Sequence, residues 1–300
     1  MNVVLAIDGS APSAVAVDLV SNVAWPAGTT IRIIQAIQTD ADLFGGLWPA
    51  VAAAQADRVE AASRRQAERA VRDAAARVAG ADLTVETGVL LGRPSTAILD
   101  EARVSGADLI VVGGRGHGTI ESMLLGSVSA EVVDHSTTPV LVARMSTVDR
   151  IVLAWDGSSV ASRAVEVLRR WPVFGKAAVR VVSVAELVHP WWTGFPPADP
   201  ADLTTISEAA DASRARHDEL ARRMAAELRE AGLSAEADPR EGDVAAEVLR
   251  SAADFGADLI ALGTRGRSEL ERLALGSVAR NVLQHARWSV LLVPEPAAGT

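Results

Sequence analysis

One glycine-rich stretch occurs twice in the chain, and this duplication restricts the fold more than any other feature. The first copy begins Gly113-Gly114-Arg115-Gly116 and ends, after nine further residues, at Gly126-Ser127. The second copy begins Gly263-Thr264-Arg265-Gly266 and ends, after the same interval, at Gly276-Ser277. The two copies lie 150 positions apart. A solenoid repeats every 20 to 50 residues or so, so a period this long indicates two whole domains.

Other segments repeat with the same order. An Asp-Leu-Ile run precedes each glycine stretch, at 108–110 and at 258–260. An Asp-Gly-Ser turn follows the first apolar run of each half, at 8–10 and at 156–158. A chain of 300 residues suits two domains of about 150 residues each. We therefore expect one domain at 1–146 and a second at 149–295.

Short apolar runs alternate with helix-like segments throughout both halves. This alternation predicts an α/β fold in which helices cover both faces of a mainly parallel sheet. In such sheets, ligands bind outside the carboxyl ends of the strands. Asp8 and Gly113 each follow a predicted strand and are expected to flank that crevice. The predicted strands are 3–7, 29–37, 83–89, 109–112, 139–143, 151–154, 178–184, 233–237, 259–262 and 289–293.

Each glycine stretch has the layout of a phosphate-binding turn, because an apolar run leads through glycines into a helix. The glycines allow positive φ and let the backbone approach a ligand closely. The Gly-Ser pair is expected to cap the helix, whose N–H groups face an anion. Arg115 and Arg265 either pair with phosphate or face solvent. The alternative for each stretch is a plain tight turn between strand and helix.

The composition excludes several classes of protein. A net charge of −9 argues against a nucleic-acid partner, and the lack of cysteine excludes disulfides, thiol catalysis and cysteine metal sites. Lys176 is the only lysine and does not stand in a Walker-type P-loop. No signal peptide and no apolar run of about 20 residues is evident, so we expect a cytoplasmic protein that does not bind membranes.

With both glycine stretches, both Asp-Gly-Ser turns and the glycines at 92 and 242, the chain resembles a tandem universal stress protein of the ATP-binding subgroup. The resemblance spans nearly the whole chain. It implies two tandem Rossmann-like domains, each a five-stranded parallel sheet of order 3-2-1-4-5. It also implies ATP binding, often with a divalent ion such as Mg²⁺ or Mn²⁺. Family members pair through their last strands, here 140–142 with 290–292 within one chain, and a homodimer is a further option.

The resemblance also assigns residues to the nucleotide. Asp8 and Asp156 lie near the adenosine, unless they only cap the following helices, and the ends of the second strands line the adenine. The glycine stretches hold ribose and phosphates, although Ser127 and Ser277 alternatively serve as helix caps. The implied ATP-binding residues are Asp8, Gly9, Ala36, Gly113, Arg115, Gly116, Gly126, Ser127 and Val128 in the first half, and Asp156, Gly157, Val184, Gly263, Arg265, Gly266, Gly276, Ser277 and Val278 in the second.

Two functions compete on this evidence. The first is a nucleotide-binding protein of stress response or signalling, with one site per domain and with protein partners that the sequence does not identify. The second is a slow ATPase or phosphotransferase that uses the same sites; we find no catalytic base at matching positions, so binding is favoured. A scaffold with one or both sites empty is a third option. Thr264 supplies a hydroxyl that Gly114 does not, which predicts tighter binding in the second half.

Overall fold

The computed structural model describes residues 1–38, 51–80, 82–114, 125–186, 200–264 and 275–295, with the backbone alone at 51–57 and 200–206. Four predicted site residues, Arg115, Gly116, Arg265 and Gly266, lie outside the described residues. The chain divides into two compact units. The first comprises Met1–Val148 and Arg287–Thr300, and the second comprises Asp149–Ala286. The domain bounds predicted from the sequence stay a prediction.

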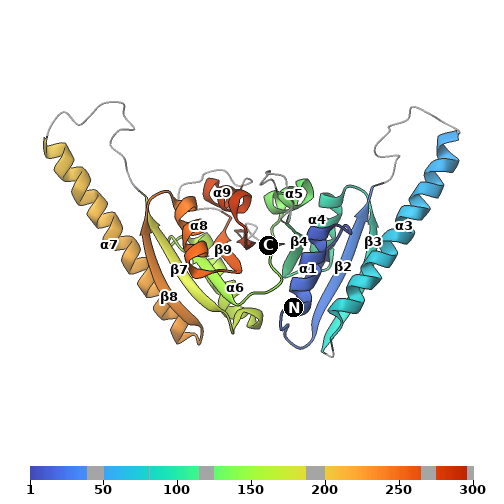
Figure 1. The fold of residues 1–300 in the computed structure, drawn as a ribbon, viewed down its shortest axis with the longest axis horizontal. Helices are drawn as coiled ribbons and strands as arrows, with labels where there is room; N and C mark the ends of the chain where they lie inside the picture. The colour runs from blue at the N-terminus through green and yellow to red at the C-terminus, as the bar shows by residue number, and fades with distance from the viewer. Residues whose placement is uncertain (39–50, 81, 115–124, 187–199, 265–274, 296–300) are drawn as a thin grey trace. The chain divides into compact units, whose positions relative to one another are not determined.

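The first unit is a doubly wound α/β sheet (Figure 1). Its strands β1 to β5 are parallel and lie in the order β3-β2-β1-β4-β5, which confirms the predicted order. The elements are β1 (Asn2–Ala6), α1 (Ala11–Asn22), β2 (Thr29–Ile37), α3 (Val51–Val78), β3 (Leu83–Leu91), α4 (Pro94–Val104), β4 (Leu109–Gly113), α5 (Ser127–His135), β5 (Val140–Ala143) and β10 (Ser289–Val293).

Burial of the central strands shows that both faces of this sheet are covered. Val3, Val4 and Leu5 of β1 are all nearly inaccessible to solvent. Successive residues of a strand point to opposite faces, so such a run needs apolar cover on both sides. Helix α1 packs with α3, and α4 packs with α5, which supplies the two covering helix pairs. The sheet thereby places the carboxyl ends of β1, β2 and β4 side by side at the same end of the sheet.

The last strand of the chain belongs to the first unit. β10 pairs antiparallel with β5, with Val290 opposite Val142 and Leu292 opposite Val140, so the predicted pairing of the terminal strands is confirmed. The hydroxyl of the fully buried Ser289 accepts the backbone N–H groups of Arg144 at 3.1 Å and of residue 145 at 3.0 Å. The sequence-distant β10 therefore fixes the chain where it leaves β5.

The second unit repeats the architecture. Its strands are parallel and follow the order β8-β7-β6-β9. β8 is longer than the predicted strand and includes Pro239, which an edge strand tolerates because one side of its backbone needs no partner. The elements are β6 (Arg150–Ala154), α6 (Ser159–Arg170), the short 3₁₀ helix η1 (Pro172–Phe174), β7 (Ala178–Ala185), α7 (Pro200–Glu230), β8 (Ser234–Glu241), α8 (Val244–Phe255), β9 (Leu259–Gly263) and α9 (Ser277–His285).

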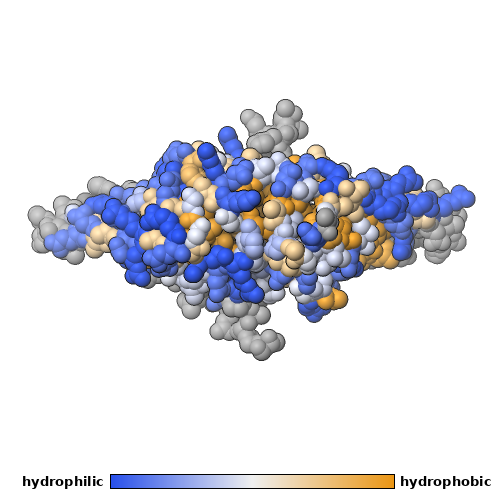
Figure 2. Space-filling view, turned by 90° about the horizontal axis from the view of Figure 1, so that it is seen from below, coloured by the Kyte–Doolittle hydropathy of each residue, from blue (hydrophilic) through white to orange (hydrophobic). Residues whose placement is uncertain are grey.

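On the face shown in Figure 2, hydrophilic residues cover much of the described surface, with apolar residues gathered between them. Among the described residues, the large apolar side chains with substantial exposure are Val59, Leu91 and Val104. Isolated apolar residues on a surface are ordinary. None of the helices in the described parts of the chain combines the length and the apolar character needed to span a bilayer.

Candidate functional site

A tight turn follows β1 and carries the first predicted ligand residue. Gly9 adopts φ +77°, which favours glycine, and the N–H of Ser10 donates to Oδ1 of Asp8 at 2.9 Å. Ser10 is the N-cap of α1, since its hydroxyl accepts the N–H of Ser13 at 3.3 Å. The interpretation of Asp8 as a helix cap is therefore wrong. Its carboxylate instead closes the turn at the carboxyl end of β1.

The same turn sets the charge of Asp8. Burial acts to raise the pKa of its carboxyl group, but hydrogen bonds from Ser10 and Ser13 together outweigh burial and hold the pKa below the ordinary value of 3.8. Asp8 is therefore a carboxylate at neutral pH. It offers a fixed acceptor of hydrogen bonds at the edge of the sheet.

The second unit builds an equivalent turn after β6. Gly157 adopts φ +78°, and the N–H of Ser158 donates to Oδ1 of Asp156 at 2.9 Å. Ser158 is the N-cap of α6, because its hydroxyl accepts the N–H of Ala161 at 3.1 Å. The alternative prediction that Asp156 only caps the following helix is therefore wrong, as it is for Asp8.

Packing, rather than backbone conformation, explains the first glycine of each repeat. A Cβ on Gly113 would lie 2.7 Å from the carbonyl carbon and oxygen of Pro12, and one on Gly263 would lie 2.8 Å from Cγ1 of Val160. None of Gly113, Gly126, Gly263 and Gly276 has positive φ, so these four residues do not use the left-handed conformation that glycine allows. Strand β4 instead ends directly against the start of α1, and β9 against the start of α6.

The later glycine of each repeat begins a helix without a side-chain cap. Gly126, at φ −58° and ψ 139°, is the N-cap of α5, and Ser127 is the first helical residue. Gly276, at φ −60° and ψ 156°, and Ser277 have the same places in α9. The serines therefore do not cap these helices. The first N–H groups of a helix lack partners within it and carry partial positive charge, so such an end suits an anion.

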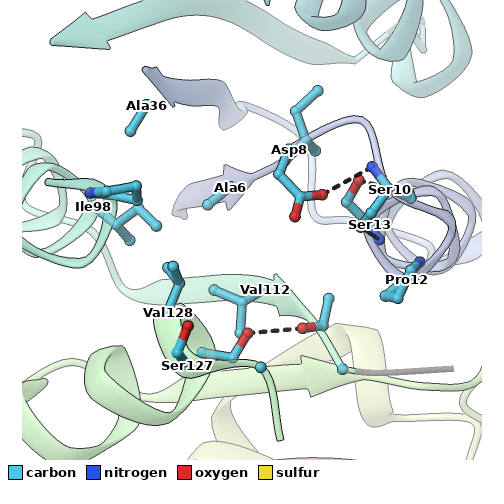
Figure 3. Close-up of a pocket in the computed structure, with 16 residues that line it drawn as sticks. Ala6, Asp8, Ser10, Pro12, Ser13, Ala36, Ile98, Val112, Ser127 and Val128 are labelled. Atoms are coloured by element: carbon cyan, nitrogen blue, oxygen red, sulfur yellow. Dashed lines mark hydrogen bonds between the residues drawn. The ribbon is translucent and has the colours of Figure 1, made fainter. Parts of the chain in front are cut away.

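These elements enclose a cavity of about 400 Å³ in the first unit (Figure 3). It is within the usual size range of small-molecule sites. The turn after β1 and the start of α1 form one side, and the start of α5 forms another (Figure 3). The hydroxyl of Ser129 donates to the carbonyl of Gly113 at 2.8 Å and fixes α5 to the end of β4. The predicted residues that line the cavity are Asp8, Ala36, Gly113, Gly126, Ser127 and Val128.

Several residues that line the cavity were not predicted from the sequence. Pro94 and Ile98 of α4, together with Val112 of β4, give the cavity an apolar wall. Pro94 marks the start of a helix in the sequence, but no local signal shows which helix faces the crevice. The described residues contain no group of three or more histidine, cysteine, aspartate or glutamate side chains placed to hold a metal ion.

Several predicted residues of the second half take corresponding positions in the second unit. Asp156 and Gly157 form the turn after β6, Val184 is near the end of β7, and Gly263 ends β9. The N–H of Gly276 donates to the carbonyl of Thr264 at 2.8 Å, which joins the start of α9 to the end of β9. Ser277 and Val278 begin α9.

A polar pair near Asp156 has no counterpart at the matching positions of the first half. The hydroxyl of Ser183 on β7 lies 2.9 Å from Nδ1 of His217 on α7. The matching positions of the first half hold Gln35 and Ala67. Ser183 is fully buried, so it is inaccessible as a nucleophile despite its histidine neighbour. Burial lowers the pKa of His217, and the charge of Asp156 opposes this shift.

His217 should make the protein less stable in mild acid. Its folded-state pKa lies below the ordinary value of 6.5, so between those two values the unfolded chain binds more protons than the folded one. Stability is therefore expected to fall as the pH drops from 7 through this window. His217→Gln keeps a polar partner for Ser183 and should reduce the dependence of stability on pH. Urea unfolding at pH 7.5 and 5.5 tests this, and an equal loss of stability in both proteins would contradict it.

The fold and the repeated arrangement of strand ends define a tandem pair of doubly wound α/β domains. The sequence model of the Universal stress protein family matches residues 1–144 and again residues 147–294. The chain belongs to the universal stress protein family.

Individual relatives agree with this assignment. A universal stress protein of Bacillus subtilis, YxiE, is 33% identical over 144 residues, which cover 47% of this chain and 96% of the relative. A universal stress protein of Mycolicibacterium smegmatis is 28% identical over 237 residues, which cover 76% of this chain and 74% of the relative. The crystal structure of a universal stress protein from Archaeoglobus fulgidus superposes with a TM-score of 0.66 at 19% identity and 98% coverage of both chains, a likeness that shows the fold.

Proposed function

We propose that this protein binds ATP, one molecule per domain, and acts by that binding in stress response or signalling. The observation that carries the proposal is the cavity of the first unit. It joins an apolar wall, a carboxylate and the uncapped start of a helix in one space of about 400 Å³. A nucleoside phosphate presents the complementary groups, namely a flat base, hydroxyl and amino donors, and an anion.

The cavity suggests an orientation for the nucleotide. The phosphates belong at Gly126 and Ser127, where α5 begins without a side-chain cap. The adenosine belongs near Asp8 and Ala36, on the other side of the space (Figure 3). The ionised carboxylate of Asp8 accepts hydrogen bonds there and lies away from the like-charged phosphates. We propose that Mg²⁺ or Mn²⁺ accompanies the phosphates, whose oxygens are preferred ligands of such ions.

Binding without rapid hydrolysis is favoured by the state of Asp8. An effective general base has a pKa near the working pH. The pKa of Asp8 is lowered instead, and one of its oxygens is already occupied by the N–H of Ser10. Slow ATPase or phosphotransferase activity remains the second candidate, and phosphate release over hours distinguishes it from binding alone.

We propose further that the protein works in the cytoplasm and that its two domains, 1–146 and 149–295, pair within the chain through their last strands. The antiparallel pairing of β5 with β10 supports this arrangement. A homodimer of the full chain and protein partners of unidentified kind belong to the same proposal.

ATP is expected to stabilise the protein against heat. Ligand at ~100 times its dissociation constant adds about 2.7 kcal/mol per site. NAD and flavin nucleotides should stabilise much less, because the glycine spacing does not match Gly-x-Gly-x-x-Gly. Thermal unfolding with a panel of nucleotides tests the proposal. A larger shift with NAD than with ATP, or no shift with ATP, would overturn it.

A further inference from the structure

Strand β3 is the edge strand of the first unit, and among the described residues it pairs with β2 alone (Figure 1). Two residues that flank the strand show which backbone groups are used. The carbonyl of Asp82 and the N–H of Gly92 each bond, at 3.0 Å, to the chain at one end of β2. Backbone groups of successive residues in a strand alternate between its two sides. Since both flanking residues have even numbers, Val85, Thr87 and Val89 direct their N–H and C=O groups away from β2.

The edge strands of the two units differ in how they are protected. In the second unit the edge strand is β8, which contains Pro239 and four charged residues. Proline and charged side chains are the usual devices that keep a sheet edge from pairing with another chain. β3 contains no proline, and Glu86 is its only charged residue. The carboxylate of Glu86 forms an ion pair with Arg32 at 2.8 Å, which offsets its charge. The β3 edge therefore lacks the protection that β8 has.

The sequence of β3 is complementary to itself in an antiparallel pair. Full overlap of its nine residues with those of a second copy places Thr87 opposite Thr87 and Val85 opposite Val89. In this register the outward-facing residues lie opposite one another, so each such pair can exchange two hydrogen bonds. Pairs of β-branched side chains stabilise such an arrangement. Glu86 lies opposite Gly88, so like charges do not meet.

We infer that the full chain forms a homodimer in which the β3 edges of two copies pair antiparallel, with Thr87 on the twofold axis. This inference rests on the homodimer in the proposed function and is independent of ATP binding. A second copy is the partner that the register favours, because one surface then serves both subunits. Pairing would also cover Leu91, which is 53% exposed, with Leu83 of the other copy. Strand β5 already pairs with β10 and is not free to join a second chain.

Val89→Pro tests the inference, because the second half already has proline at the matching position. Val89 lies opposite Gln35 of β2, as Pro239 lies opposite Ser183 of β7. Proline removes an N–H that faces away from β2 and leaves the bonds to β2 in place, so the fold should survive. Both copies lose a donor at the interface. The dissociation constant of the dimer, measured by sedimentation equilibrium of the full chain, should rise at least about tenfold.

Thr87→Lys tests the register itself. Position 87 is exposed, and the substitution places two like charges directly opposite each other at the axis, so dimerisation should weaken about tenfold. An equimolar mixture of Thr87→Lys and Thr87→Glu should restore dimers, because opposite charges then meet. Ala237→Lys is the matched control. It stands 150 residues later, on the protected strand β8, and should leave the dissociation constant unchanged.

The possible failures of this inference are distinguishable. A dimer that neither Val89→Pro nor Thr87→Lys weakens would place the interface elsewhere and overturn the inference, while the homodimer itself would stand. A mixture of the Lys and Glu variants that stays monomeric would overturn the register. If circular dichroism shows that Val89→Pro is unfolded, the variants at position 87 decide alone. A wild-type chain that stays monomeric at every soluble concentration would refute both the inference and the homodimer, and ATP binding is measured separately by calorimetry.

Discussion

Gly113→Ala is expected to lower the free energy of unfolding of the first unit by about 3 kcal/mol, the upper part of the range for overpacked sites. The added Cβ would lie 2.7 Å from the carbonyl carbon and oxygen of Pro12 and 2.8 Å from the backbone nitrogen of Ser13. Backbone atoms at the start of α1 cannot rotate away as a side chain can. Either β4 or α1 must therefore shift, and both belong to the core of the unit.

Two other glycines provide graded controls in urea unfolding. A Cβ on Gly126 would meet its nearest atom, Oγ of Ser129, at 3.7 Å, an ordinary contact, so Gly126→Ala should cost about 1 kcal/mol or less. Gly263→Ala should be intermediate, because its nearest obstacle is Cγ1 of Val160, which has some freedom to move. If Gly113→Ala unfolds at the same urea concentration as Gly126→Ala, the close approach of β4 to α1 is wrong.

Gly113 shows which features of the site can be predicted from the sequence. The glycine stretch correctly marks the end of a strand and the start of a helix, because both depend on local pattern. The packing reason for glycine at 113 was not predictable, since it depends on the distance to Pro12, which lies about a hundred residues earlier in the chain. The end of a strand and the start of a helix depend on neighbouring residues and can be predicted from a sequence. Close approach between distant segments cannot.

The residue that caps a helix was also only partly predictable from the sequence. The Asp-Gly-Ser turn predicts a helix start, yet either Asp8 or Ser10 has a side chain suited to the cap. The structure assigns the cap to Ser10, because Gly9 at φ +77° turns the chain so that Asp8 accepts the N–H of Ser10. Two candidate caps that are two residues apart differ only in this turn, which sequence patterns do not resolve.

Strict alternation predicted the parallel α/β sheet, and the family resemblance implied the strand order, which the structure confirms in the first unit. The pair of Ser183 and His217 was not predictable. These residues are far apart in the sequence and meet only because α7 packs on β7. The pairing of β10 with β5 was implied by the resemblance, but the hydrogen bonds that Ser289 accepts beyond β5 depend in addition on the exact register of these strands. Such contacts follow from topology and from the register of strands.

Gly126→Glu is expected to abolish ATP binding in the first site without loss of the fold. The backbone at Gly126, with φ −58°, suits any residue, and a Cβ there has room. A carboxylate at the start of α5 would occupy the N–H groups that the phosphates need and would repel them. Juxtaposed like charges cost several kcal/mol, so affinity should fall on the order of 100-fold. The helix itself tolerates an acidic residue at its start.

The matching residue allows the two sites to be counted. Titration calorimetry of the wild-type chain should give two ATP per chain. Gly126→Glu and Gly276→Glu should each give about one, and the double variant should give none, with circular dichroism unchanged throughout. Gly126→Gln is a control of similar size without the charge, and it should weaken ATP binding less than Gly126→Glu does. If both single Glu variants still bind two ATP, the phosphates do not lie at the starts of α5 and α9.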